Sequence, residues 1–356
     1  MMSAQPKVAV RENPASNAVS FREQLADLNV APLWDVLTGL VPAEPRPKAT
    51  PHAWRWAVMR DRLIESGTVV SAEEAERRVL MLENPGLGGL PNATDTIYAG
   101  LQLILPGEIA RAHRHTQSAL RFVLEGVGGY TSVDGVRTEM LRGDFIVTPA
   151  WTWHDHGNDG AGPVMWLDGL DVPLVTFLRA GFREEYETAT QFPRKGDSDQ
   201  VLVRYADALL PLESKDTGST SPIFNYPYAR TREVLDELAR NSDIDACHGV
   251  NVRYANPLTG GWAMPTIAAS MRLIPRGYTT EFFQSVEGTV LVGVEGSPSV
   301  EIEGVGSFDI SDNDVFVVPG WSRWRMSADA SDDAVLFVYS DRPVYEKLGL
   351  YREKRG

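Results

Sequence analysis

Two stretches of the chain alternate short apolar runs with glycine-containing turns. In residues 96–175, the runs LQLIL, RFVLEG and DFIVTP are separated by Gly and Asp-Gly turns. The runs MRLIP, TVLVGVEG and DVFVVPGW give residues 256–345 the same character. Short β-rich runs bounded by such turns are typical of an all-β barrel or sandwich built from hairpins. We therefore expect the fold to be dominated by β structure.

The segments that precede these stretches have a helical pattern instead. Apolar side chains recur at helical spacing in SFREQLADLNVAPLWDVLTGL, where Ser20 or a neighbour is a candidate cap, and TREVLDELARN predicts a helix that begins at Thr231. The expected organisation is a helical or irregular N-terminal arm, a first β unit, a linker with a helix, a second β unit and a C-terminal tail. Their ranges are 1–95, 96–175, 176–255, 256–345 and 346–356.

The two β stretches are copies of one unit at a constant offset in the numbering. Gly107 falls on Gly277, and Glu125–Gly126 falls on Glu295–Gly296. GDFIVTPAWTWH at 143–154 falls on NDVFVVPGWSRW at 313–324, which matches an aspartate, a valine, a proline and a tryptophan. Several matches that all keep one offset indicate an internal duplication.

Composition excludes some classes of function. The formal net charge is −14, with 34 basic against 48 acidic residues, and nucleic-acid binding needs the opposite sign. The chain contains no run of about 18 apolar residues, so we do not expect a membrane span. The N-terminus lacks the apolar core of a signal peptide. The single cysteine, Cys247, excludes an intrachain disulfide framework and suits a reducing compartment. We expect a cytoplasmic protein with a small-molecule partner.

Four of the six histidines lie in two short segments, AHRHT at 112–116 and WHDHGN at 153–158. His113 and His115 are two residues apart on a predicted strand and therefore share a face, and His154 can join them from a neighbouring strand. Three imidazoles of this kind suit Fe(II), Zn, Cu or Ni. Their counterparts in the second copy are Phe283, Ser285 and Trp324. Loss of all three histidines there favours one functional unit over ordinary surface histidines.

These segments resemble the two motifs of the cupin superfamily. G107-EIARA-H113-R-H115 resembles the first motif, and G143-DFIVT-P149-A-W151-TW-H154-DHG-N158 resembles the second, with Trp151 where Gly is usual. The resemblance implies a bicupin, two double-stranded β-helix (jelly-roll) barrels joined by helical or irregular segments. Cupins usually carry a glutamate as a fourth ligand, separated from the histidine pair by three or four residues. Here those positions are Ala119 and Leu120, which leaves room for a chelating substrate.

A more specific resemblance is to the gentisate 1,2-dioxygenase family, which includes salicylate and 1-hydroxy-2-naphthoate dioxygenases. NPGLGG, AHRHTQSALRFVLEG, GDFIVTPAWTWHDHGND and WLDGLDVP carry it, and the histidine-free second copy extends it over most of the chain. WTWHDH is more similar to the gentisate branch than to the salicylate branch. The resemblance implies Fe(II) held by His113, His115 and His154, and gentisate opened with O2 to maleylpyruvate.

The resemblance also implies roles for other residues. Arg121, which shares a strand face with Ala119, would hold the substrate carboxylate, and His156 and Asp168 would assist acid–base chemistry at the ring hydroxyl. Further candidates for the substrate pocket are Gln102, Arg77, Tyr98 and Trp151. The second cupin would serve packing and assembly into a homotetramer. Two alternatives stay open: a dioxygenase for salicylate or 1-hydroxy-2-naphthoate, and a non-enzymatic ligand-binding bicupin.

Overall fold

The computed structural model describes residues 14–193, 205 and 218–356, in two compact units, Met1–Arg46 and Pro47–Gly356. The described part of the first unit consists of α1 (Pro14–Asp27) and α2 (Leu33–Leu40). The helical stretch predicted here is therefore two helices, because Pro32 stands at the start of α2 and fixes an extended backbone there. Ser20 lies inside α1 rather than at its start, so the cap predicted at Ser20 is wrong.

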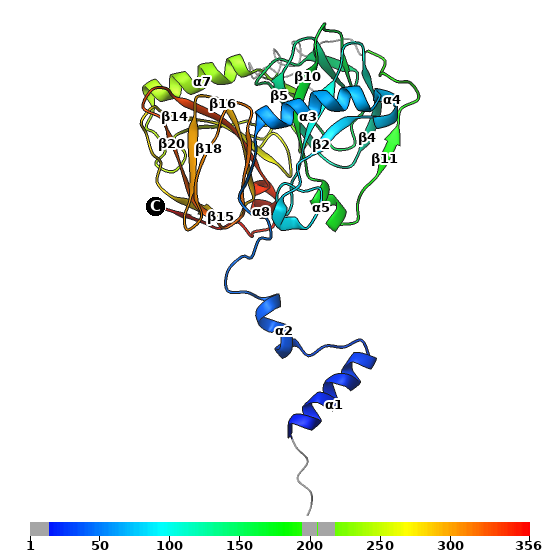
Figure 1. The fold of residues 1–356 in the computed structure, drawn as a ribbon, viewed down its shortest axis with the longest axis vertical. Helices are drawn as coiled ribbons and strands as arrows, with labels where there is room; N and C mark the ends of the chain where they lie inside the picture. Colours follow the sequence, from blue (N-terminus) through cyan, green and yellow to red (C-terminus); the bar gives the residue numbers. More distant parts are fainter. Residues whose placement is uncertain (1–13, 194–204, 206–217) are drawn as a thin grey trace, which may run out of the picture. The chain divides into compact units, whose positions relative to one another are not determined.

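The second unit contains two barrels, each made of two antiparallel sheets (Figure 1). In the first barrel the strand orders are β12-β8-β5-β10-β3-β2 and β11-β4-β9-β6-β7. Its strands are β2 (Arg78–Met81), β3 (Tyr98–Ile104), β4 (Ile109–His115), β5 (Ala119–Glu125), β6 (Gly129–Val133), β7 (Val136–Glu139), β8 (Phe145–Thr148), β9 (His154–Asn158), β10 (Val164–Leu170), β11 (Arg183–Glu185) and β12 (Asn225–Tyr226).

The second barrel repeats this arrangement, with strand orders β1-β19-β16-β21-β14-β13 and β18-β17-β20-β15-β22. Its strands are β1 (His52–Trp54), β13 (Val250–Arg253), β14 (Ala268–Ile274), β15 (Phe283–Ser285), β16 (Thr289–Glu295), β17 (Pro298–Ile302), β18 (Gly306–Asp309), β19 (Val315–Val318), β20 (Arg323–Ala328), β21 (Ala334–Ser340) and β22 (Glu353–Arg355). The predicted bicupin fold is confirmed.

The duplication seen in the sequence holds at the level of whole elements. β3 and β14, and likewise β10 and β21, have the same length and are related by the offset of the sequence repeat. The short helices that follow the last pair, α5 (Val172–Phe177) and α8 (Arg342–Lys347), keep the same offset. The remaining helices described in this unit are α3 (Trp56–Val69), α4 (Ala72–Ala75), the 3-10 turn η1 (Pro85–Leu87) and α7 (Tyr228–Asn241).

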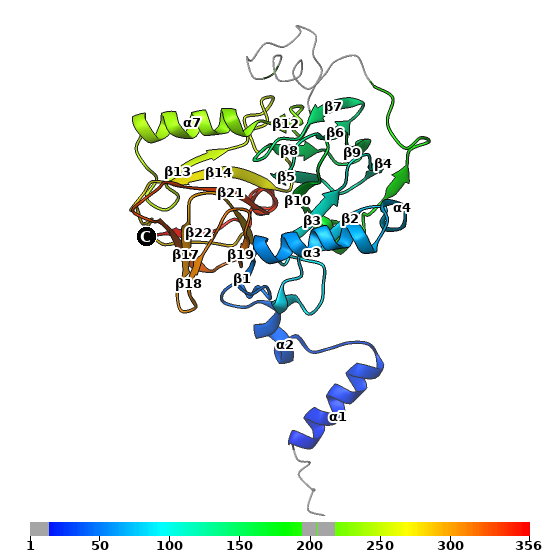
Figure 2. The same ribbon diagram turned by 45° about the horizontal axis from the view of Figure 1, so that its top comes forward.

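Each barrel is completed by a strand from the segment that leads into the other barrel. β1 precedes the first barrel but pairs with β19 of the second, and β12 precedes the second barrel but pairs with β8 of the first. The helix α3, which follows β1 in the chain, runs along the first barrel and packs against β2 and β3 (Figure 2). We call this reciprocal pairing of β1 and β12 the strand exchange.

An aspartate shared by the two copies fixes the helix that follows each exchanged strand. Asp314 accepts a hydrogen bond from the backbone N–H of Trp56 (2.7 Å), and Asp144 accepts one from Tyr228 (2.9 Å). A carboxylate at a helix N-terminus satisfies free N–H groups and complements the helix dipole. α7 therefore begins at Tyr228, and the prediction that it begins at Thr231 is wrong, because the carboxylate comes from another part of the chain.

One hydrophobic core cluster joins the two barrels, and each barrel has a further cluster of its own. The rings of Phe122 and Phe337 stack with centroids 4.2 Å apart, and both belong to a buried cluster drawn from both copies. At the same junction Thr266 donates to Asp171 (2.5 Å), and the equivalent Thr96 donates to Asp341. Strands outside the predicted boundaries at 96–175 and 256–345 extend the sheets, and the domain boundaries themselves stay a prediction.

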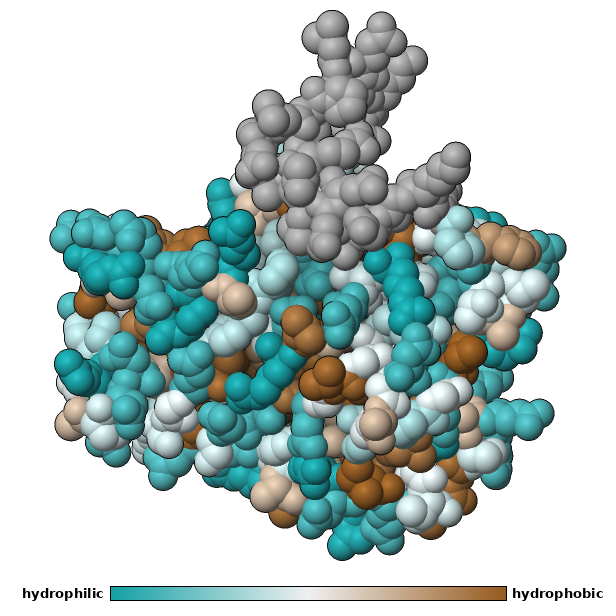
Figure 3. All heavy atoms as spheres, turned by 90° about the horizontal axis from the view of Figure 1, so that it is seen from above, coloured by the Kyte–Doolittle hydropathy of each residue, from teal (hydrophilic) through white to brown (hydrophobic). Residues whose placement is uncertain are grey.

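Among the described helices, none has the length and apolar character needed to cross a bilayer. On the face of the molecule shown in Figure 3, hydrophilic side chains surround smaller hydrophobic groups. This pattern is ordinary for a protein surface in contact with water.

Candidate metal centre

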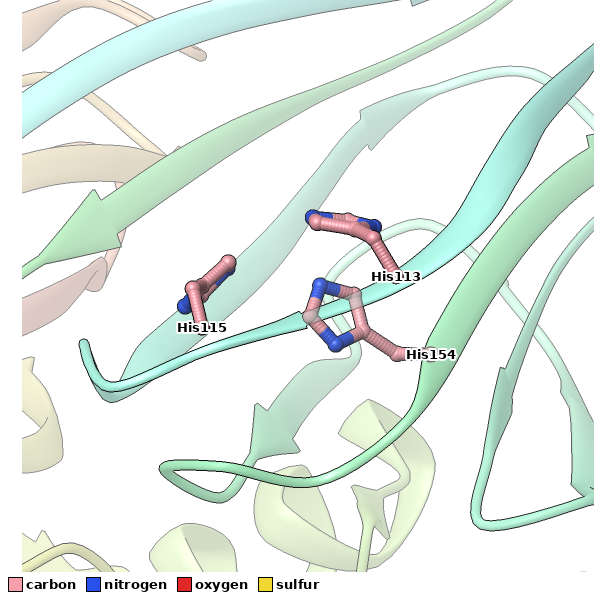
Figure 4. Close-up of side chains that lie close together, drawn as sticks. All are labelled: His113, His115 and His154. Atoms are coloured by element: carbon pink, nitrogen blue, oxygen red, sulfur yellow. The ribbon is translucent and has the colours of Figure 1, made fainter. Parts of the chain in front are cut away.

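Three histidines converge inside the first barrel from two paired strands. His113 and His115 lie on β4, and His154 lies on β9 directly opposite His113. The ring centroids of His113 and His154 are 4.1 Å apart, and a nitrogen of each of the three rings lies within 4.8 Å of the others. Figure 4 shows the three rings turned toward one common space. The predicted convergence of these residues is confirmed.

Backbone carbonyl groups orient these rings. Nδ1 of His115 lies 2.9 Å from the carbonyl oxygen of Gln117, and Nδ1 of His154 lies 2.9 Å from that of Thr152. Nδ1 of His113 lies 3.2 Å from the carbonyl of Arg111. We assign the Nδ1–H tautomer to all three, which leaves each Nε2 lone pair free to bind a metal.

Arg77 competes for one of these contacts. Its Nη2 lies 2.6 Å from Nδ1 of His113 and 3.1 Å from the carbonyl oxygen of Arg111. A ring nitrogen cannot donate to Arg111 and accept from Arg77 at once. In the metal-binding tautomer of His113, Nδ1 therefore donates to the carbonyl oxygen, and Arg77, which also lines the cavity, keeps its own bond to Arg111.

The surroundings keep the three imidazoles neutral. Burial, reinforced by Arg77, lowers the pKa of His113 to about 2, and burial lowers the pKa of His115 to about 4. Burial also holds the pKa of His154 well below its usual value. Neutral imidazole is the form that binds metals, so the site is ready to bind at physiological pH.

The donor set fits a divalent metal ion. Within the described part of the chain, Nε2 of His154 is buried without a hydrogen-bond partner. A buried polar atom of this kind needs an explanation, and a metal ligand supplies one. Three imidazole nitrogens on one side of a metal leave further coordination positions open, as catalytic metal sites do.

The histidines open onto a cavity of about 260 Å³. It brings together most of the residues that the sequence proposed for the site: Arg77, Tyr98, Gln102, His113, His115, Arg121, His154 and Asp168. The side chain of Ala119, where many cupins carry a glutamate ligand, also lines it. The small methyl group leaves this side of the metal site open.

Arg121 is a buried cation at the cavity wall, fixed by three neighbours. It donates to the hydroxyl of Thr148 (2.6 Å) and to Nε2 of His156 (2.8 Å), and its Nε lies 3.4 Å from Asp168. The contact with Asp168 is an ion pair by distance but lacks hydrogen-bond geometry, since Nε has no hydrogen-bond partner among the described residues. Arg121 is therefore held rigidly and keeps donor capacity for a ligand.

Asp168 faces Arg121 across two paired strands. Its Oδ1 also accepts a hydrogen bond from the indole N–H of Trp166 (3.0 Å). Burial raises the pKa of Asp168 to about 6, while the charge of Arg121 opposes that rise. The carboxyl therefore titrates close to neutral pH, as groups that exchange protons at functional sites do.

Two predicted site residues lie away from the cavity wall. His156 is fully buried behind Arg121, and its Nδ1 is 2.8 Å from the hydroxyl of Thr131. Trp151 is not among the lining residues; its side chain is 37% exposed, and the guanidinium of Arg114 stacks 4.5 Å from its ring centroid. Its backbone φ of +59° explains why glycine is usual there. The roles proposed for both residues stay predictions.

Sequence reasoning missed part of the cavity wall. The additional lining residues are Val79, Leu170, Val172 and Arg183. Arg183 lies on β11, directly opposite His115 of β4. No local motif marks Arg183, because its position depends on the pairing of β11 with a strand that is distant in sequence. Leu170 and Val172 lie inside the segment WLDGLDVP that carried the family resemblance, but nothing in its sequence marked them as cavity residues.

Comparisons with known proteins agree with this site. The model of the cupin domain matches residues 100–171. Gentisate 1,2 dioxygenase 1 of Aquipseudomonas alcaligenes is 48% identical over 336 residues, 94% of this chain and 96% of that protein. Gentisate 1,2-dioxygenase of a Streptomyces species is 38% identical, over 93% of both chains.

Solved structures give the same answer. The structure of salicylate 1,2-dioxygenase from Pseudoaminobacter salicylatoxidans, described as adducts with gentisate, superposes with a TM-score of 0.87. Its sequence is 34% identical, and the match covers 99% of this chain and 97% of that chain. With relatives that match almost from end to end and the same two-barrel fold, the chain belongs to the gentisate 1,2-dioxygenase family of ring-cleaving cupin dioxygenases.

Proposed function

We propose that this protein is an Fe(II)-dependent dioxygenase that opens the ring of gentisate between C1 and C2 and incorporates both atoms of O2 to give maleylpyruvate. The single observation that carries the proposal is the convergence of three neutral histidines beside a buried arginine in the first barrel. The names of the relatives, which are dioxygenases of hydroxylated aromatic acids, support the choice of substrate.

His113, His115 and His154 would hold the iron through their Nε2 atoms. When bound, the iron supplies a Lewis acid that holds the aromatic acid and O2 on one centre. The identity of the metal rests on this donor set and on the family.

The chain's own residues would bind and orient the substrate. Arg121, fixed by Thr148 and His156, would face the carboxylate with a planar fork of donors. Arg77 and Gln102 line the same cavity and would contact the polar substituents of the ring, and Tyr98 would form an aromatic wall.

Proton exchange would fall to the residues around Arg121. Asp168 is a buried cavity group whose pKa lies near neutrality, at about 6, and we propose that it takes part in proton movement at the ring hydroxyl. His156 would position Arg121, since its Nε2 accepts a hydrogen bond from that guanidinium. A direct acid–base role for His156 and a substrate contact for Trp151 remain predictions.

A related hydroxyaromatic acid is the second candidate substrate. A relative named for 1-hydroxy-2-naphthoate is 35% identical over 87% of this chain, and the solved structure compared above is that of a salicylate 1,2-dioxygenase. The higher identity to a protein named for gentisate favours gentisate.

We further propose a cytoplasmic location and assembly into a homotetramer. The buried, unpaired Cys247 suits a reducing compartment. The family resemblance is the basis for the tetramer. Light scattering of the purified protein tests assembly, and a monomer at micromolar concentration would contradict it.

The reaction is tested by loading the protein with Fe(II) under argon and measuring O2 uptake with gentisate, salicylate and 1-hydroxy-2-naphthoate in parallel. We expect the fastest uptake with gentisate and no uptake with the His154→Ala variant. Uptake with salicylate but not with gentisate would overturn the choice of substrate, and no uptake with any acid would overturn the proposed reaction.

A further inference from the structure

Arg183 lies where two hollows of the first barrel meet. It lines the cavity that contains the histidines and also a neighbouring groove of about 380 Å³. Among the described residues, His115, Leu170 and Val172 also line both the cavity and the groove. The groove is otherwise lined by Gln117, Gly181 and Phe182. Arg183 is thus the charged side chain that a ligand meets on passing from the groove to the histidines.

Where the cavity meets the groove, which we call the cavity mouth, Arg183 forms ion pairs with two glutamates. Its guanidinium lies 2.8 Å from the carboxylate of Glu76 and 2.6 Å from that of Glu185. Arg183 and Glu185 belong to β11, in the sheet of β4, whereas Glu76 follows α4, which leads into β2 of the opposite sheet. Figure 1 shows α4 and β11 side by side at this edge of the barrel.

Three arginines line the cavity, and two of them, Arg121 and Arg183, are suited to different tasks. Arg121 is buried and fixed by Thr148 and His156, so it cannot reach toward solvent. The side chain of Arg183 is 49% exposed, and that of its partner Glu76 is 64% exposed. An exposed ion pair contributes little stability, so Arg183 can exchange one carboxylate for another at small cost.

Such an exchange addresses an electrostatic obstacle. The chain carries a formal net charge of −14, which repels an approaching acid at long range. The guanidinium of Arg183 offers the acid a positive group once Glu76 gives way, while Glu185 keeps its own contact at 2.6 Å. In the second barrel the residue equivalent to Arg183 is Glu353, so the charge belongs to the histidine-bearing copy.

We propose that Arg183 captures the carboxylate of the arriving aromatic acid at the cavity mouth by exchanging Glu76 for it. This inference rests on the proposed function for the nature of the acid. It makes Arg183 a selector for anionic over neutral ring compounds, and it makes Glu76 a competitor of the substrate.

The test is the association rate constant of gentisate with the Fe(II)-loaded protein under argon, measured by stopped-flow fluorescence. We expect Arg183→Gln to lower this constant about 5- to 10-fold and Arg183→Lys to lower it less. Glu76→Gln should raise it about 2- to 5-fold, because the competitor is removed. Both effects should shrink as salt is added.

Two controls define specificity. Arg137→Gln removes another exposed arginine that pairs with a carboxylate, Asp159, at 2.6 Å, and it should leave the association rate within about 2-fold of wild type. With the neutral analogue 2,5-dihydroxybenzamide, Arg183→Gln and wild type should bind at equal rates.

The sign of the two changes separates capture from a passive latch. If the ion pair only closes the mouth, Arg183→Gln and Glu76→Gln will both accelerate binding, and the proposal fails. Equal rates for Arg183→Gln and wild type also overturn it. A wild-type protein that binds gentisate but does not consume O2 with it refutes the proposed reaction, while the capture role is still decided by the rates.

Discussion

The two barrels share one strand framework but use three equivalent positions in opposite ways. The first barrel places His113, His115 and His154 around a cavity, and Nε2 of His154 lacks a hydrogen-bond partner among the described residues. At the equivalent positions of the second barrel, Phe283 and Trp324 are buried in a hydrophobic cluster. The third equivalent, Ser285, donates a hydrogen bond to Glu287 (3.1 Å). The framework therefore does not require histidine at any of the three positions, and two of them serve packing in the second barrel.

The features that both copies keep show what the framework does require. Asp144 and Asp314 both fix a helix start, and Trp151 and Trp321 both adopt a positive φ, +59° and +61°. These shared residues set backbone geometry, whereas the differing residues set the chemistry. Substitutions at the differing positions and at the contacts between the barrels test this comparison.

The largest expected effect comes from truncating equivalent residues, His154 and Trp324. His154→Ala should weaken metal binding on the order of 100-fold or more, because it removes one of three ligands, with little loss of stability. Trp324→Ala should instead lower the free energy of unfolding by about 3–5 kcal/mol through a core cavity and leave metal content unchanged.

Metal analysis and urea unfolding of the two variants check this contrast. Loss of metal from Trp324→Ala, or an equally unstable His154→Ala, would show that the division between chemistry and packing is incorrect.

A smaller effect concerns how the free energy of unfolding depends on pH. It comes from Asp168, whose counterpart in the second barrel is the uncharged Val338. The folded-state pKa of Asp168 is about 6, above the value of about 3.9 expected for an unfolded chain. Between these values the folded protein binds more protons, so the free energy of unfolding falls as pH rises from about 4 to about 6.

The metal-free protein should therefore lose up to about 3 kcal/mol over that window relative to Asp168→Asn. Urea unfolding at several pH values measures the difference. Parallel curves for the two proteins would mean that Asp168 is ionised in the fold throughout.

The smallest expected effect on stability tests whether the two hydrogen bonds between the barrels, from Thr266 and from Thr96, are equivalent. Thr266→Val and Thr96→Val each remove one hydroxyl donor, to Asp171 and Asp341 respectively. Each variant should lose about 1–2 kcal/mol of unfolding free energy, because a buried carboxylate oxygen loses its partner. Thermal unfolding compares them, and a loss in only one variant would show that the symmetry is superficial.

The sequence predicted those parts of the site that depend on local spacing. His113 and His115 follow from alternation along one strand, and the internal repeat identified His154 as their partner. The capping of α7 did not follow, because Asp144 lies 84 residues before Tyr228, whose N–H donates to it. Arg183 was missed for a similar reason, since the pairing of β11 with β4 brings it to the cavity.

The strand exchange was also out of reach of sequence patterns. β1 and β12 span three and two residues, too short to give a periodic signal. Their partners, β19 and β8, are fixed by the packing of whole barrels.

The strand exchange has a consequence for how this enzyme can be taken apart. A fragment that ends before residue 225 would leave the main-chain groups of β8 open along one side, and a fragment that begins after residue 54 would do the same to β19. Unprotected edges of this kind recruit other chains and aggregate. The catalytic half therefore cannot be reduced to a minimal one-barrel catalyst by truncation, and any such engineering has to supply a substitute for the borrowed edge.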